Sequence, residues 1–390
     1  MSPESLTCQR AAFSLPQGLH YLNCAYMGPL PRVAQEAGIA GIQRKTDPSR
    51  IVAVDFFAES AEARRLFAEL IHAENAARVA IIPAVSYAMA NVARNTPIAA
   101  GQNIVVCAED FPSDIYTWRK VAHRSGATLR VASAPAQQTR RGEEWNARVL
   151  EAIDADTAVV AVPHAHWTDG TLFDLITIGA AARAVGAAFV IDGTQSVGAL
   201  PFDVREVQPD ALICAGYKWL LGPYSIGVAY FGPRYDHGEP IEDNWIVRRG
   251  SEDFQRLVDY EDEYAPGAIR YDVGERSNFI LLPMLVAAVR LILEWTPGRI
   301  QQYCRRLAAE PVEQARALGF MVEEDNWRGS HVFGLRMPPG LDLKRLHEEL
   351  QRRRVCVSLR GSALRVSPNV YNDQEDLHAL VQVLTDVVSA

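Results

Sequence analysis

Lysine is scarce in this sequence, and the common nucleotide-binding motifs are missing from it. Only four of the 390 residues are lysines, so arginine makes up 35 of the 39 basic residues. Neither G-x-G-x-x-G nor G-x-x-x-x-G-K-[ST] occurs, which argues against a nicotinamide-dependent dehydrogenase and a P-loop protein. The net charge is −8 with no basic block, so we expect no nucleic-acid-binding surface.

Paired cysteines and long apolar runs are also missing. The six cysteines form no C-x-x-C pair, which indicates reduced thiols rather than a disulfide framework or a zinc site, and we expect no metal. The first ten residues, MSPESLTCQR, lack the apolar core of a signal peptide, and no apolar run is long enough to cross a bilayer. These features predict a cytoplasmic protein without a membrane partner.

Seven short apolar runs recur between residues 78 and 231, and helical stretches lie between several of them. Strands that are apolar throughout are typical of a sheet covered on both faces. We therefore predict an α/β fold with an open, mostly parallel, seven-stranded sheet and helices on both faces. The runs cover residues 78–82, 103–108, 128–134, 158–163, 187–193, 211–216 and 226–231.

The length of the chain and a change in its pattern predict more than one domain. After about residue 283, longer amphipathic stretches appear, followed by strand-like runs between further helices. We predict a large α/β domain over residues 61–282 and a smaller C-terminal α+β domain over 283–390. Residues 1–60 are predicted to form a segment that packs on both.

Two charged residues stand at the ends of neighbouring predicted strands. Asp192 is the last residue but one of the run AAFVIDG, and Lys218 follows the run ALICAG almost directly. Alone, Asp192 could cap a helix, and Lys218 could extend its ammonium to solvent. Together they match pyridoxal phosphate chemistry, in which a lysine forms a Schiff base with the aldehyde and an aspartate keeps the ring nitrogen protonated. Ligands of open α/β sheets bind at this edge.

The motif around this pair resembles a known family. Asp192-Gly-Thr-Gln195, Gly216-Tyr217-Lys218 and the following GPYSIG are similar to the class V aminotransferase group of fold-type I pyridoxal phosphate enzymes. That group includes cysteine desulfurases, isopenicillin N epimerase and kynureninase. The resemblance runs from Tyr21 to about Tyr371 and implies the fold-type I architecture with pyridoxal phosphate as cofactor.

The resemblance implies further cofactor contacts. Phe111 and Asp114, in the segment FPSD, are similar to a kynureninase segment whose phenylalanine stacks on the cofactor ring. Val85 and Ser86 begin a predicted helix where the family binds phosphate, and a helix N-terminus suits an anion. Tyr217 resembles a tyrosine that hydrogen-bonds the phosphate. Without the resemblance, Phe111 would simply begin a helix and Ser86 would simply cap one.

Two polar residues are implied near the phenolic oxygen of the cofactor, namely His166 in PHAHWTDG and Gln195. We count His166 among the predicted catalytic residues, although a single histidine is more often structural, as His164 could be. The segment VGERSNFILLP resembles a stretch that reaches the neighbouring subunit's site. It implies Ser277 and Asn278 as cofactor and substrate contacts in a homodimer with shared active sites.

An alternative reading of the same segment makes Glu275 and Arg276 a solvated surface pair.

Near the C-terminus, ALRVSPNVYN resembles the kynureninase segment whose arginine binds the substrate carboxylate. Arg365 is therefore the predicted carboxylate ligand, because a guanidinium can donate two hydrogen bonds to one carboxylate. Arg360 is a second candidate.

The expected reaction begins when a small amino acid displaces Lys218, whose freed amine then removes the α-proton. We place transamination first and keep a Cβ lyase, either kynureninase-like or a C–S lyase, or an epimerase as alternatives. Desulfuration is disfavoured, because no cysteine lies between Arg360 and Arg365, and Cys356 lies in an apolar run where thiols are usually inert. The pairing of Lys218 with Asp192 disfavours a non-catalytic binding protein.

Overall fold

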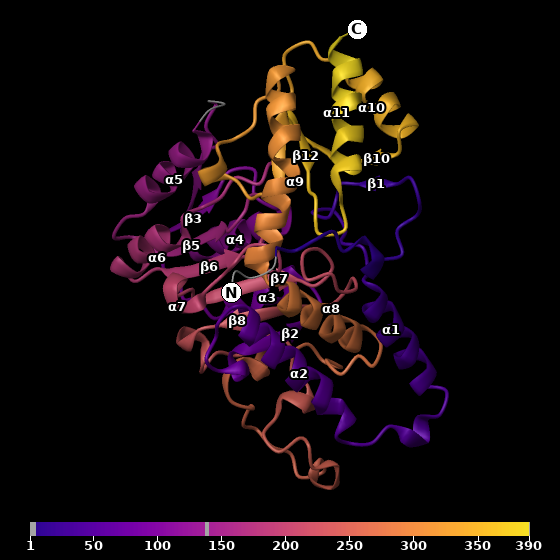
Figure 1. Ribbon diagram of the computed structural model, residues 1–390. Coiled ribbons are helices and arrows are strands. Elements are labelled where there is room, and N and C mark those ends of the chain that lie inside the picture. Colours follow the sequence, from indigo (N-terminus) through magenta and orange to yellow (C-terminus); the bar gives the residue numbers. More distant parts are fainter. Residues whose placement is uncertain (1–4, 137–139, 390) are drawn as a thin grey trace.

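A seven-stranded sheet forms the centre of the protein in the computed structural model, which describes residues 5–136 and 140–389 (Figure 1). Its strand order is β2-β8-β7-β6-β5-β3-β4. The five strands from β7 to β4 are parallel to one another, whereas β8 is antiparallel to both β7 and β2. The strands are β2 (Val79–Ile82), β3 (Asn103–Cys107), β4 (Thr128–Ala132), β5 (Thr157–Pro163), β6 (Ala188–Asp192), β7 (Ala211–Ala215) and β8 (Gly227–Phe231).

Helices cover both faces of this sheet, which explains why most of its strands are apolar throughout. In β5, Val160 and Val162 point into a core shared with α2, α5, α6 and α8, whereas Val159 and Ala161 point into a second core with α3 and α4. The predicted α/β architecture is therefore confirmed. The helices are α2 (Asp55–Leu70), α3 (Val85–Arg94), α4 (Pro112–Ser125), α5 (Arg141–Ala152), α6 (Leu175–Ala184), α7 (Val204–Val207) and α8 (Leu281–Trp295).

A separate core lies in the C-terminal part of the chain. An antiparallel sheet in the order β11-β12-β9 packs against α10, α11 and the second half of α9, and Figure 1 shows these helices at the end of the molecule where the C-terminus lies. The elements are α9 (Pro297–Ala317), β9 (Phe333–Arg336), α10 (Leu343–Arg352), β10 (Val355–Cys356), β11 (Ser358–Arg360), β12 (Ala363–Val366) and α11 (Gln374–Val388).

The N-terminal segment contacts both cores. Strand β1 (His20–Tyr21) pairs in parallel with β10, and Leu22 lies in the C-terminal core. Phe13 and Cys24 lie in the core of the large sheet, as does part of α1 (Arg32–Arg44). The helix α8 and the first half of α9 pack in that core as well, whereas the second half of α9 packs in the C-terminal core. The boundary between the two cores therefore falls within α9. The predicted domain boundaries stay predictions.

No single helix among the described residues is long and apolar enough to span a membrane. The pair α8 and α9 passes that test of length and composition only when taken together, and the two helices meet at a bend of 70°.

Candidate active site

A cavity of about 310 Å³ lies at the carboxyl edge of the parallel strands. It exists there because parallel strands all end on the same side of the sheet, where their loops converge. Asp192 comes from the end of β6, and Lys218 from the loop after β7. Phe111 comes from the loop after β3. The predicted pair, 26 residues apart in sequence, therefore lines one cavity.

The amine of Lys218 is buried beside aromatic rings. Its side chain is 7% exposed, and Nζ lies 5.4 Å from the ring centre of Phe111 and 5.5 Å from that of Tyr217. Burial lowers the pKa of Lys218 to about 8, against the opposing charges of Asp192 and Asp114. A lysine that loses its proton near neutral pH can act as a nucleophile and as a base.

Asp192 faces the cavity with further carboxyl groups behind it. Its Oδ1 accepts a hydrogen bond from the backbone N–H of Thr194 at 2.8 Å. Asp110 and Asp114 are buried next to it. Burial, followed by the charge of Asp192, raises the pKa of Asp110 to about 8, and raises that of Asp114 well above its usual range. With this pKa, Asp110 is mostly protonated at neutral pH, which limits the negative charge around Asp192.

The helix α3 begins at the cavity without a side-chain cap. Ala84 occupies the N-cap position, and Val85 and Ser86, in the first turn, line the cavity. The first amides of a helix have no partner inside the helix, and the helix dipole favours an anion beside them. Tyr217 and Ser225 bring hydroxyl groups to the same cavity. This arrangement can bind a phosphate group.

Gln195 lines the cavity and is held by two neighbours. Its Nε2 donates to the backbone oxygen of Ala25 at 3.1 Å, and its Oε1 accepts from Nε1 of Trp219 at 2.9 Å. The second hydrogen of its amide group has no partner within the described residues. This hydrogen is therefore available for the predicted contact with the phenolic oxygen of the cofactor.

The structure places His166 away from the cavity and brings Trp167 to it instead. His166 is fully buried, with Nδ1 2.7 Å from Oγ1 of Thr168 and Nε2 3.2 Å from the backbone oxygen of Ala108. The Trp167 ring meets that of Phe111 edge-on, with ring centres 5.7 Å apart. Sequence reasoning missed Trp167, although its position next to His166 is a usable signal. A catalytic role for His166 stays a prediction that this geometry does not favour.

Both predicted carboxylate ligands lie near Lys218. Arg365 is 1% exposed, and its Nη1 donates to the backbone oxygen of Trp167 at 2.6 Å. The guanidinium of Arg360 lies 5.5 Å from the Trp167 ring. The positive charges of both arginines lower the pKa of Lys218 further. These contacts put the two guanidiniums on the Trp167 side of the cavity.

Ser277 and Asn278 do not line this cavity within the same chain. The hydroxyl of Ser277 donates to the backbone oxygen of Phe56, and Oδ1 of Asn278 accepts from the first amides of α8. The alternative of a solvated pair between Glu275 and Arg276 is wrong, because Arg276 is buried and forms an ion pair with Asp272 at 2.7 Å.

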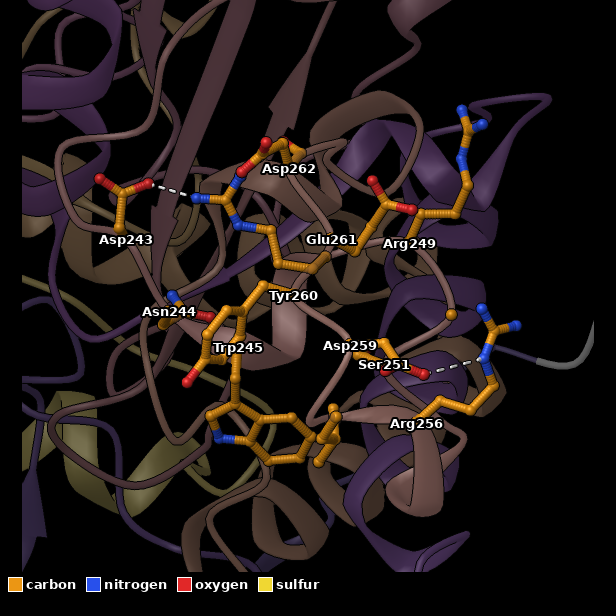
Figure 2. Close-up of a pocket in the computed structure, with 13 residues that line it drawn as sticks. Asp243, Asn244, Trp245, Arg249, Ser251, Arg256, Asp259, Tyr260, Glu261 and Asp262 are labelled. Atoms are coloured by element: carbon orange, nitrogen blue, oxygen red, sulfur yellow. Dashed lines mark hydrogen bonds and ion pairs between the residues drawn. The ribbon is translucent and has the colours of Figure 1, made fainter.

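A second cavity, of about 490 Å³, lies within the loop 243–262 (Figure 2). No lysine or cysteine lines it. Its arginines are matched by carboxylates, for example Arg248 with Asp243 at 2.6 Å and Arg256 with Asp259 at 4.0 Å. Across the described part of the chain, no cluster of histidine, cysteine and carboxylate side chains is arranged to hold a metal ion. The cavity around Lys218 is therefore the stronger candidate for catalysis.

The chain is similar to known proteins over most of its length. The family model described as aminotransferase class-V matches residues 50–380. An uncharacterised aminotransferase of Bacillus subtilis (strain 168) is 26% identical over 84% of this chain and 83% of its own length. Isopenicillin N epimerase of Streptomyces clavuligerus is 26% identical over 93% of each chain. A solved structure of C-DES, with glycine covalently linked to the pyridoxal phosphate cofactor, superposes with a TM-score of 0.84 at 19% identity, covering 98% of this chain and all of the other.

Proposed function

The chain belongs to the aminotransferase class-V family of pyridoxal phosphate enzymes, and from that premise we propose that it transfers the amino group of a small amino acid. The observation that carries the proposal is one cavity lined by a buried amine, a carboxylate and an uncapped helix N-terminus. When bound, pyridoxal phosphate supplies an aldehyde that condenses with amines and a ring that withdraws electrons.

The cavity contains a residue suited to each part of this cofactor. The first turn of α3, with Val85 and Ser86, would bind the phosphate together with Tyr217. Asp192 would pair with the ring nitrogen, and Phe111 would stack on the ring. Gln195 would reach the phenolic oxygen through its remaining amide hydrogen.

Lys218 is the acid and base of the proposed reaction. With a pKa of about 8, its amine can accept the proton of the substrate α-carbon and, as an ammonium, donate that proton again. Arg365 orients the substrate by holding its α-carboxylate. Asp114 is buried close enough to Asp192 that, after burial, the charge of Asp192 raises the pKa of Asp114.

Desulfuration is not supported, because neither Cys24, which contacts the backbone oxygen of Lys218, nor Cys356 is a reactive thiol. Cys24 is fully buried, and burial raises its pKa to about 11. The pKa of Cys356 in β10 is also raised by burial. An epimerase is the second candidate, because isopenicillin N epimerase is similar over 93% of each chain. A Cβ lyase is kept as a further alternative.

The test of the reaction is product analysis on the holoenzyme. Amino acids are supplied singly, and keto acid, ammonia and the pyridoxamine form of the cofactor are followed. Transamination predicts keto acid and pyridoxamine in equal amounts without ammonia, whereas accumulation of ammonia without pyridoxamine would establish a lyase. Borohydride reduction should attach the cofactor to the peptide containing Lys218, and the Lys218→Ala variant should lose this attachment but keep its fold.

We also propose a cytoplasmic homodimer in which Ser277 and Asn278 complete the partner's active site. In support, α1 and the segment after it expose apolar side chains that a second copy could cover. Mixing an inactive Lys218→Ala subunit with an inactive Asn278→Ala subunit should restore activity at one site per dimer. Restoration fails if the sites are not shared. The exposed side chains are Val33, Ile39, Ile42, Val52 and Val54.

A further inference from the structure

Two arginines lie on the same face of the hairpin formed by β11 and β12. The strands are antiparallel, with Ser358 opposite Arg365 and Arg360 opposite Ala363. Side chains two residues apart along a strand point to the same face, and so do directly opposed residues. Arg360 and Arg365 are therefore diagonal neighbours, and both contact Trp167, which lines the cavity of Lys218.

Neither guanidinium has a carboxylate partner in the part of the chain that the structure describes. Arg336, on the neighbouring strand β9, does have one, because it pairs with the buried Asp169. Arg365 is almost fully buried and Arg360 is half-buried. A guanidinium removed from water without a counter-ion costs free energy, so a pair of them beside a cavity indicates a place where anions bind.

Each arginine keeps enough free donors to bind one anion. Arg365 uses Nη1 on the backbone oxygen of Trp167, and Arg360 uses Nη1 on that of Leu359 at 2.8 Å. In both, Nε is buried without a partner among the described residues. The edge formed by Nε and Nη2 can donate two parallel hydrogen bonds to one carboxylate. Two such edges match two carboxylates.

We infer that the substrate is an amino acid with a second anionic group, whose α-carboxylate binds Arg365 and whose side-chain carboxylate binds Arg360. This inference rests on the proposed function. It names the substrate class as acidic amino acids of the size of aspartate or glutamate. Trp167 contacts both arginines, Arg365 through its backbone oxygen and Arg360 through its ring. A substrate with a single carboxylate would leave one of the two arginines without a counter-ion.

The test measures binding of inert carboxylates to the holoenzyme by titration calorimetry. Glutarate and succinate represent substrates with two anionic groups, and butyrate represents those with one. The wild type should bind the better of the two dicarboxylates at least ten times more tightly than butyrate. Arg360→Gln should remove that preference, weakening dicarboxylate binding about tenfold or more and butyrate binding less than twofold. Arg360→Lys should fall between the two.

Arg352→Gln, which removes the same charge from the exposed surface of α10, is the matched control and should change neither affinity. Equal weakening of all three carboxylates by Arg360→Gln would show that both arginines hold the α-carboxylate, and no weakening would place Arg360 outside the site. Either result overturns the inference. The proposed function is tested separately by attachment of the cofactor to Lys218, so that a holoenzyme without dicarboxylate preference overturns only the substrate class.

Discussion

Replacement of Lys218 by methionine should stabilise the cofactor-free protein at neutral pH. Burial lowers the pKa of this lysine from 10.5 to about 8, and each pKa unit corresponds to about 1.4 kcal/mol. At pH 7 the folded protein must therefore accommodate a charged amine at a cost of about 3 kcal/mol, which an uncharged side chain of similar length avoids. Unfolding of a chain of 390 residues has an entropy of roughly 0.8 kcal/mol/K, so the melting temperature should rise by about 4 °C.

The pH dependence of this effect has a definite sign. Because the folded pKa of Lys218 lies below the unfolded value, the unfolded chain binds more protons between about pH 8 and pH 10.5, and wild-type stability rises with pH in that window. The advantage of the Lys218→Met variant should fall from about 3 kcal/mol at pH 7 to about 1 kcal/mol at pH 9.5.

Calorimetric melting of both cofactor-free proteins at the two pH values measures the difference. Lys120→Met, at an exposed position on α4, is the control and should show no comparable shift. The reasoning would be refuted if Lys218→Met melted at or below the wild-type temperature at pH 7, or if its advantage did not change with pH. Either result would mean that the amine is solvated or paired in the folded protein.

Three further substitutions test other parts of the site. Ser86→Asp places a carboxylate at the N-terminus of α3 and should raise the dissociation constant of pyridoxal phosphate at least about tenfold, or 1.4 kcal/mol, by cofactor titration, whereas Ser86→Ala should have a small effect. Asp110→Asn should stabilise the protein at pH 9 by at least about 1 kcal/mol in urea unfolding. The reason is that the folded pKa of Asp110, about 8, lies above its unfolded value, so wild-type stability falls as the pH rises to 8. The stabilisation should vanish near pH 4. Gly28→Ala would drive its Cβ into the carbonyl oxygen of Lys218 and should cost about 2 kcal/mol or more in the same assay, since a backbone atom cannot yield as a side chain can.

The strands of the large sheet could be predicted because their signal is local. All seven apolar runs form strands, and the run at 158–163 coincides with β5 to within one residue. The order of the strands could not be read from the sequence, because pairing is decided by contacts between distant residues. The pairing of β1 with β10 also escaped prediction, since two-residue strands carry no periodic pattern.

The candidate site was predictable where a residue type is unusual for its place. Lys218 and Asp192 are charged residues at the ends of apolar strands, and both line the predicted cavity. His166 and Trp167 show the limit of this reasoning. The two residues lie after the end of β5, where the backbone turns between His166 and Gly170, and the course of that turn decides which of the two side chains faces the cavity. The sequence pattern does not determine the course of that turn.

The charges around Lys218 connect its chemistry to substrate binding. Burial is the largest cause of the lowered pKa of Lys218 and of that of Arg365, which falls to about 10. After burial, Arg365 and Arg360 lower the pKa of Lys218, and Arg360 lowers that of Arg365. An anion that pairs with either guanidinium cancels part of this repulsion, so the pKa of the amine rises when an anion is bound. A group with a higher pKa is a stronger base. Once the substrate has freed the amine of Lys218, the carboxylate bound to Arg365 therefore makes that amine a stronger base.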